Sequence, residues 1–137
     1  MHHPKVSLDG KELYYVSNSK EGFGEDDIYK IALHDDGSYG IPENLGPTIN
    51  TKEREIYPFM SSNNVLYFSS DGHGGKGYLD IFSSNYESGK YNNVKNVKGE
   101  VNSEYDDFAF VISPEKRIGY FSSSRKGKGD ADIFSFK

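Results

Sequence analysis

The sequence has no cysteine, no long apolar run and no cluster of basic residues. Without cysteine, disulfide bonds, thiol catalysis and cysteine-type zinc sites are excluded. No apolar run approaches the roughly 18 residues of a membrane-spanning helix, so we expect no membrane span. The 16 Lys and Arg residues are outnumbered by 21 Asp and Glu residues. We therefore expect neither nucleic acid nor anionic lipid as a partner.

Apolar residues are also scarce, at 34% of the 137 residues, which predicts a thin and distributed core. Aromatic residues nevertheless reach 15%, all of them Tyr or Phe, which argues against a disordered chain. Tyr, Gly and Ser take the place of the Leu and Ala that a helical bundle needs. No segment has a sustained helical period, so strands are the expected elements.

The sequence repeats itself with a period of 52 to 53 residues. Three kinds of block recur: one rich in Leu, Tyr, Phe and Ser, one rich in Gly that ends in Asp-Ile-aromatic, and one that ends in Asn-Thr or Asn-Ser. They occupy residues 13–17, 66–70 and 119–123, then 22–29, 75–82 and 127–134, and finally 44–51 and 96–103. Because all three keep one register, the chain is built from three copies of one structural unit.

Each unit is expected to contain four short strands separated by turn-forming residues. The first strands are predicted at 3–7, 57–61 and 108–112, and the second strands coincide with the blocks at 13–17, 66–70 and 119–123. The third strands are centred on Asp-Ile-aromatic, and the fourth strands on 39–45 and 91–97. Turns are expected between the first and second strands, at 8–11, 62–64 and 113–116.

Four strands in about fifty residues are typical of a β-propeller blade. We therefore predict an all-β fold over residues 1–137, with four-stranded antiparallel blades at about 3–51, 56–103 and 107–137. The last blade lacks its outer strand. Layers between the blades are expected to bury the apolar residues of the second and third strands. These are Leu13, Tyr15, Leu66, Phe68, Ile81, Phe82, Tyr120, Phe121, Ile133 and Phe134.

Three blades do not close a propeller, because closed rings have about four to eight. Three explanations are open. The chain is a fragment of a longer propeller, or it is half of a six-bladed ring that a second copy completes, or another polypeptide supplies the missing blades.

The combined pattern resembles the TolB-type propeller repeat, in the version found in OmpA-family envelope proteins of Bacteroidetes-like bacteria. The motifs that carry the resemblance are Pro-Phe-x-Ser, Leu-Tyr-Phe-Ser-Ser, Gly-x-Gly-x-x-Asp-Ile-Phe and Asn-Leu-Gly-x-x-Ile-Asn-Thr. They cover nearly the whole chain. Two departures from the family stand out: no OmpA-like domain is present, and there are three repeats where about six are usual.

The resemblance implies a non-catalytic binding or scaffolding module without cofactors, in the periplasm or at the outer membrane. Its partners would be another envelope protein or the missing blades, with peptidoglycan reached only through a separate domain. No apolar leader follows Met1, so an exported protein would have lost its leader or carry it outside this sequence. The alternatives are a carbohydrate- or calcium-binding propeller and an accessory propeller of a hydrolase.

The candidate binding residues lie in the Gly-rich loops. Asp27, Asp80 and Asp132 take the same place in each unit, where they could bind a cation or accept hydrogen bonds from loop N–H groups. Their repetition favours the structural role, because a scaffold need recurs in every unit. Asp26, Asp71 and Asp130 are the carboxylates that could assist a cation site. We assign no metal to these loops.

His73 is the remaining candidate, and we expect it to be a solvated loop residue. The paired carboxylates that precede the first strands, Glu53 with Glu55 and Asp106 with Asp107, could be acid/base groups, but without a partnered His we expect surface or turn residues. The Gly-rich loops lead into strands rather than a helix, which argues against nucleotide binding. No Gly-x-Ser-x-Gly motif is present, so no hydrolase nucleophile is expected.

Overall fold

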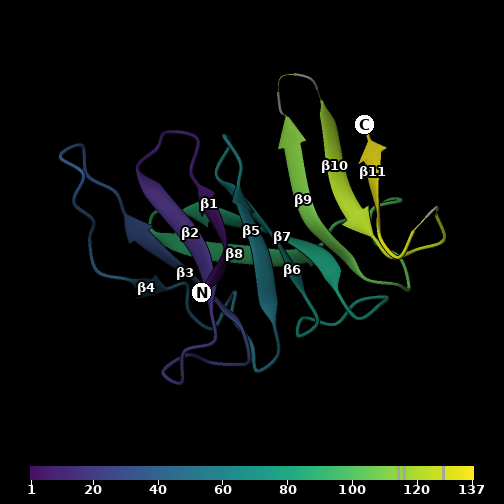
Figure 1. Cartoon of the computed structure of the whole chain (residues 1–137), viewed down its shortest axis with the longest axis horizontal. Coiled ribbons are helices and arrows are strands. Elements are labelled where there is room, and N and C mark those ends of the chain that lie inside the picture. The colour runs from purple at the N-terminus through teal and green to yellow at the C-terminus, as the bar shows by residue number, and fades with distance from the viewer. Residues whose placement is uncertain (114, 116, 128) are drawn as a thin grey trace.

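The computed structural model describes all residues except 114, 116 and 128. Parts of the turn expected at 113–116 and of the third Gly-rich loop therefore lie outside the described residues. The described residues form eleven strands and no helix (Figure 1). None of their segments is a helix long and apolar enough to cross a lipid bilayer.

The strands form three antiparallel sheets that follow one another along the chain from purple to yellow in Figure 1. The first sheet contains β1 (His2–Val6), β2 (Glu12–Ser17), β3 (Asp27–Ala32) and β4 (Glu43–Asn44). The second contains β5 (Glu55–Met60), β6 (Val65–Ser70), β7 (Asp80–Glu87) and β8 (Lys90–Asn96). The third contains β9 (Asp107–Ser113), β10 (Ile118–Ser123) and β11 (Asp132–Phe136). Strands that are neighbours in sequence pair in every sheet.

The predicted all-β fold, with sheets of four, four and three strands, is confirmed. The fourth strand of the first sheet is shorter than the expected 39–45. Only Glu43–Asn44 forms β4, and an isolated bridge joins Tyr39 to Leu33. Pro42 has no N–H to donate and precedes β4 directly, which limits regular pairing to the two residues after it.

The repeated sequence blocks correspond to repeated strand register. An aromatic pair joins the second and third strands of each sheet: Tyr15 with Tyr29, Phe68 with Phe82, and Phe121 with Phe134. One residue before the aromatic residue of each third strand, Ile28, Ile81 and Ile133 take equivalent places on the opposite side of the sheet. Because side chains alternate across a strand, each sheet has one aromatic side and one isoleucine side. We call them the front face and the back face.

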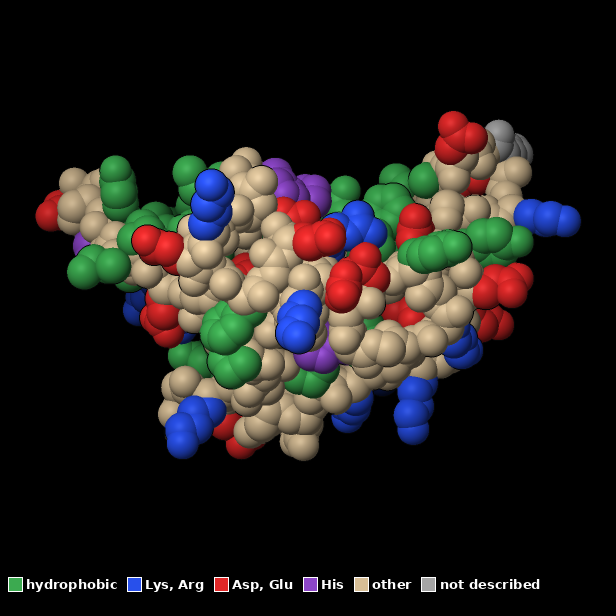
Figure 2. All heavy atoms as spheres, turned by 90° about the horizontal axis from the view of Figure 1, so that it is seen from below, with side chains coloured by type: hydrophobic (Ala, Val, Ile, Leu, Met, Phe, Trp, Pro, Cys, Tyr) green, Lys and Arg blue, Asp and Glu red, His purple; other side chains and the backbone are tan. Residues whose placement is uncertain are grey.

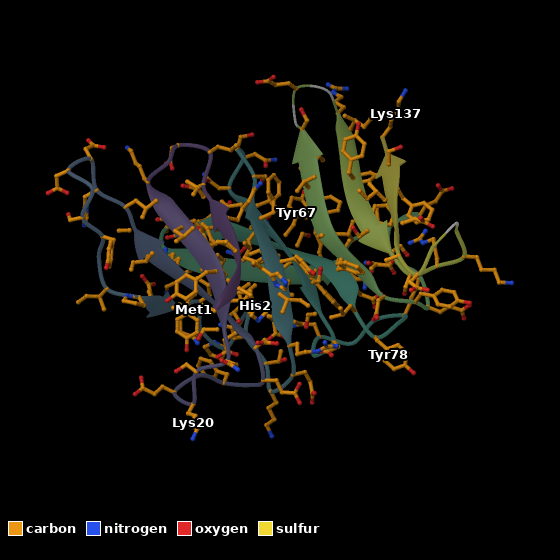
Figure 3. The ribbon with its side chains drawn as sticks, viewed as in Figure 1. Met1, His2, Lys20, Tyr67, Tyr78 and Lys137 are labelled. Atoms are coloured by element: carbon orange, nitrogen blue, oxygen red, sulfur yellow. The ribbon has the colours of Figure 1, made fainter. Side chains whose placement is uncertain are left out.

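The sheets stack front to back. One core layer joins the back face of the first sheet, with Tyr14, Val16 and Ile28, to the front face of the second, with Leu66 and Phe68. A second layer joins the back face of the second sheet, with Ile81, to Phe110 and Phe121 of the third. Figure 3 shows Tyr67 between the second and third sheets, where its ring lies 4.5 Å from that of Phe110. The core is thus divided into two thin layers.

This stacking corrects part of the predicted core. Leu66, Phe68, Ile81, Phe82 and Phe121 are buried as expected. In the first sheet Tyr14 and Val16 are buried instead of Leu13 and Tyr15, which are only half-buried. In the third sheet Phe134 is half-buried, while Tyr120 is 44% and Ile133 77% exposed. The reason is positional, because each end sheet has one face that no neighbouring sheet covers.

The third repeated block links one sheet to the next through an asparagine. The Oδ1 of Asn50 accepts from the backbone N–H of Ile28 at 2.8 Å, and its Nδ2 donates to the carbonyl of Ile28 at 2.9 Å. Asn102 makes the same two bonds with Ile81 at 2.7 and 2.8 Å. The buried amide satisfies both backbone groups at once, which explains why Asn recurs 52 residues apart.

Candidate functional site

Two fully buried carboxylates stand where each connecting segment enters the next sheet. Glu55 begins β5 and Asp107 begins β9, and both are 0% exposed. The expectation that they lie at the surface is therefore wrong. Each is buried because it is surrounded by donors, without which a carboxylate would remain in water.

The donors are the same in both places. Glu55 accepts from the backbone N–H and the hydroxyl of Thr51 and from the hydroxyl of Ser70, each at 2.7 Å. Asp107 accepts from the N–H and hydroxyl of Ser103 at 2.6 and 2.9 Å, and from the hydroxyl of Ser123 at 2.6 Å. Thr51 and Ser103 belong to the connecting segment, whereas Ser70 and Ser123 end the second strands.

A basic side chain completes each group. The Arg125 Nη2 lies 2.8 Å from the Asp107 Oδ1, and its guanidinium also donates to the carbonyls of Glu100 and Val101. The equivalent residue in the preceding unit is His73, whose Nε2 lies 2.6 Å from the carbonyl of Ile49. A carbonyl can only accept, so Nε2 carries the proton. We call these two groups the junction clusters, because each holds a connecting segment to the next sheet.

His73 is consequently not the solvated loop residue that the sequence suggested. Its ring is half-buried and packs edge-on to Phe68, with centroids 5.5 Å apart. Burial raises the pKa of Glu55, and the hydrogen bonds from Thr51 and Ser70 together with the charge of His73 oppose this rise. In this arrangement the Ser70 hydroxyl donates a hydrogen bond to the Glu55 carboxylate, so its role is structural.

The repeated loop aspartates close their Gly-rich loops. Asp27 accepts from the backbone N–H groups of Phe23 and Gly24 at 2.5 and 3.2 Å, and from the Asn44 amide at 2.9 Å. Asp80 accepts from Lys76 and Gly77 at 2.5 and 3.3 Å. Asp132 accepts from Gly129 at 3.3 Å. These bonds match the structural role favoured by their repetition. They use both carboxylate oxygens of Asp27, whereas the Oδ1 of Asp80 is buried without a hydrogen-bond partner among the described residues.

The other carboxylates do not join them in one site. Asp71 accepts two hydrogen bonds from the Arg54 guanidinium, at 2.9 and 2.8 Å, and a third from the backbone N–H of Arg54 at 2.9 Å. Asp26 lies 3.2 Å from the Nε2 of His2, and Asp130 is exposed. Within the part of the chain that the structure describes, no three His, Asp or Glu side chains are placed to hold a metal ion.

A row of aromatic rings crosses all three sheets along their first strands, and the sequence did not reveal it. The rings of His3 in β1 and Tyr57 in β5 are stacked with centroids 3.7 Å apart, and Tyr57 and Phe108 in β9 are 5.4 Å apart. We call this surface the first-strand edge. A hollow of about 270 Å³ opens beside the row, lined by residues of β1, β5 and β9 that include Lys5, Phe59 and Val111.

The backbone of the first-strand edge repeats an uncommon conformation. His3, Tyr57 and Ala109 have positive φ angles of 50°, 53° and 56°, although none is glycine. Each lies at the irregularity where its strand bulges from its partner. Bulges redirect side chains and leave backbone groups unpaired, and such strained conformations gather at functional surfaces. The regular spacing of the three first strands was the sequence signal that could have revealed this surface. The residue types at positions 3, 57 and 109 do not by themselves indicate a left-handed backbone.

No protein-family model matches the sequence, and no curated protein matches it.

Proposed function

We propose that the chain is a non-catalytic binding module of the bacterial cell envelope, built from propeller-type blades and acting on another protein. The first-strand edge is the surface that makes the contact. The observation that carries this proposal is the aromatic row of His3, Tyr57 and Phe108, presented by three strained bulges beside one hollow.

The propeller-type arrangement is supported by how the sheets meet. The first strand of the second sheet, β5, lies beside both β1 and β9, whereas the backbones of β4 and β8, both fully described, do not come close to each other. Sheets that converge at their first strands and diverge at their last strands form a fan, which is the arrangement of blades around an axis. In such a fan the first-strand edge lies nearest the axis.

The rest of the polar architecture supports binding rather than catalysis. Glu55, Asp107 and Asp27 are saturated with donors from their own chain. Their function is accounted for by holding loops and connecting segments. The first-strand edge instead presents partly exposed aromatic rings on bulged strands, and aromatic rings are enriched where proteins recognise a partner. The envelope location follows from the resemblance to the TolB-type repeat.

Site-specific photo-crosslinking in the bacterium that makes the protein tests the proposal. A photoreactive amino acid replaces Lys5 or Ala109 at the first-strand edge, and Lys90 on β8 provides the exposed control. We expect both edge positions to form an adduct with the same envelope protein and Lys90 to form none. Adducts of equal yield from all three positions, or an adduct found in the cytoplasmic fraction, would overturn it.

A further inference from the structure

The two end faces of the stack are complementary to each other. The first sheet leaves its front face open, and the third sheet leaves its back face open. Figure 2 shows hydrophobic side chains at both ends of the molecule, over the first sheet and over the third. Inside the molecule, each core layer forms between a back face and a front face. Each open face therefore presents one half of such a layer.

The residues of the open back face show this most clearly. Ile28 and Ile81 are 0% exposed in their layers, whereas the equivalent Ile133 is 77% exposed. Tyr120 likewise takes the place of the fully buried Tyr14, and Val111 lies opposite it on β9. This face carries the tyrosine and isoleucine that a following sheet would cover.

The open front face matches in the opposite sense. Tyr15 and Tyr29 are stacked at 5.7 Å, in the register where Phe68 and Phe82 fill the first core layer. Around them lies an apolar hollow of about 430 Å³, lined by residues that include Leu13, Ile31 and Tyr39. It presents the aromatic pair and the leucine that a preceding sheet would cover.

We infer that two copies of this chain associate end to end, with the back face of the third sheet of one copy on the front face of the first sheet of the other. Continuity with the internal interfaces argues for a second copy as the occupant, because both existing layers join a Tyr- and Ile-bearing back face to an aromatic front face. The open faces of this chain are one of each kind. The inference rests on this stacking and not on the proposed envelope function, so either can fail alone.

A front-to-back contact is heterologous, which gives it a specific signature. Disrupting either face should abolish association, because every contact needs one intact front face and one intact back face. Mixing a chain with a broken front face and a chain with a broken back face should restore one contact. A symmetric contact between like faces would not show this complementation.

The test measures mass by sedimentation velocity over a range of concentrations. Ile133→Asp breaks the back face at an exposed position, and Tyr15→Asp breaks the front face. Tyr39→Asp, at an exposed residue of the same hollow, replaces Tyr15→Asp if the latter unfolds. Tyr78→Asp, in an exposed loop outside both faces, is the matched control (Figure 3).

We expect the wild-type chain and Tyr78→Asp to exceed the 15.4 kDa monomer as concentration rises. Each face variant alone should stay monomeric, and the mixture should give a one-to-one dimer. A wild-type chain that stays monomeric up to its solubility limit would overturn the inference. So would face variants that associate like the wild type, or a mixture that does not associate.

Discussion

The Arg125 guanidinium lies 2.8 Å from the fully buried carboxylate of Asp107 and also bonds to two carbonyls of the segment that connects the second and third sheets. The ion pair thus joins the loop after β10 to β9, and the same guanidinium holds the connecting segment at Glu100 and Val101. In the preceding junction cluster His73 and Glu55 take the equivalent places.

Removing the Arg125 charge should leave a carboxylate buried without its partner. Arg125→Met keeps an apolar stem against Phe121 and Phe134, so the change mainly tests the ion pair. We expect a loss of about 3 kcal/mol in the free energy of unfolding, measured with urea. Arg54→Met is the control, because its pair with Asp71 is more exposed and should cost about 1 kcal/mol or less. Equal losses would contradict the assigned role.

Glu55 should make stability depend on pH in the direction opposite to most carboxylates. Burial raises its pKa above the ordinary value of 4.5, so the folded state binds the proton more tightly than the unfolded state. Its contribution is complete below pH 4.5 and is lost as the pH rises through the folded pKa. The stability of wild type relative to Glu55→Gln should therefore increase as the pH is lowered from neutral.

The control for this experiment is Asp36, whose pKa is lowered below its ordinary value of 3.8, chiefly by the hydroxyl of Ser38. Its contribution is present above pH 3.8 and is lost as the pH falls through the folded pKa. Wild type relative to Asp36→Asn should thus lose stability on acidification. The same pH trend for both variants would contradict the account of Glu55.

The Gly-rich loop before β7 should tolerate a methyl group at one glycine and not at its neighbour. Both Gly74 and Gly75 have positive φ angles, of 81° and 129°. A Cβ on Gly74 meets open space, whereas one on Gly75 would overlap the Asp80 carboxylate that closes the loop. We expect Gly74→Ala to cost about 1 kcal/mol and Gly75→Ala about 3 kcal/mol by thermal unfolding. Equal costs would show that Asp80 does not close this loop.

The bulge in β9 should reverse the usual effect of an alanine-to-glycine change. Ala109 has a φ of 56°, which costs a residue with a Cβ more than it costs glycine. Ala109→Gly should stabilise the chain by about 0.5–1 kcal/mol in urea unfolding. Ala32→Gly, in the exposed end of β3, should destabilise it by a similar amount. A loss at both sites would mean that Ala109 is not strained.

Strand positions could be predicted from the sequence because the repeat aligns three independent copies of each strand. The buried face could not, since residues 13–16 are all apolar and alternation does not distinguish their two sides. Which side is covered depends on whether another sheet lies in front or behind. That is a property of the stack rather than of the strand.

The junction clusters were missed for a related reason. Glu55 lies in the polar run 51–55, which is typical of a surface, and the hydroxyl of Ser70 that stabilises it comes from 15 residues away. The spacing of Glu55 and Asp107, 52 residues, was the available signal. Likewise, the aromatic row comes together only when β1, β5 and β9 are neighbours in space.

Hydrogen exchange on the chain with and without the purified crosslinked partner tests the central claim most directly. If the first-strand edge is the binding surface, the amides of β1, β5 and β9 should be protected together when the partner binds. The outer strands β4 and β8 should exchange at unchanged rates. Protection confined to β4, β8 or the Gly-rich loops, with β1, β5 and β9 unaffected, would contradict the account.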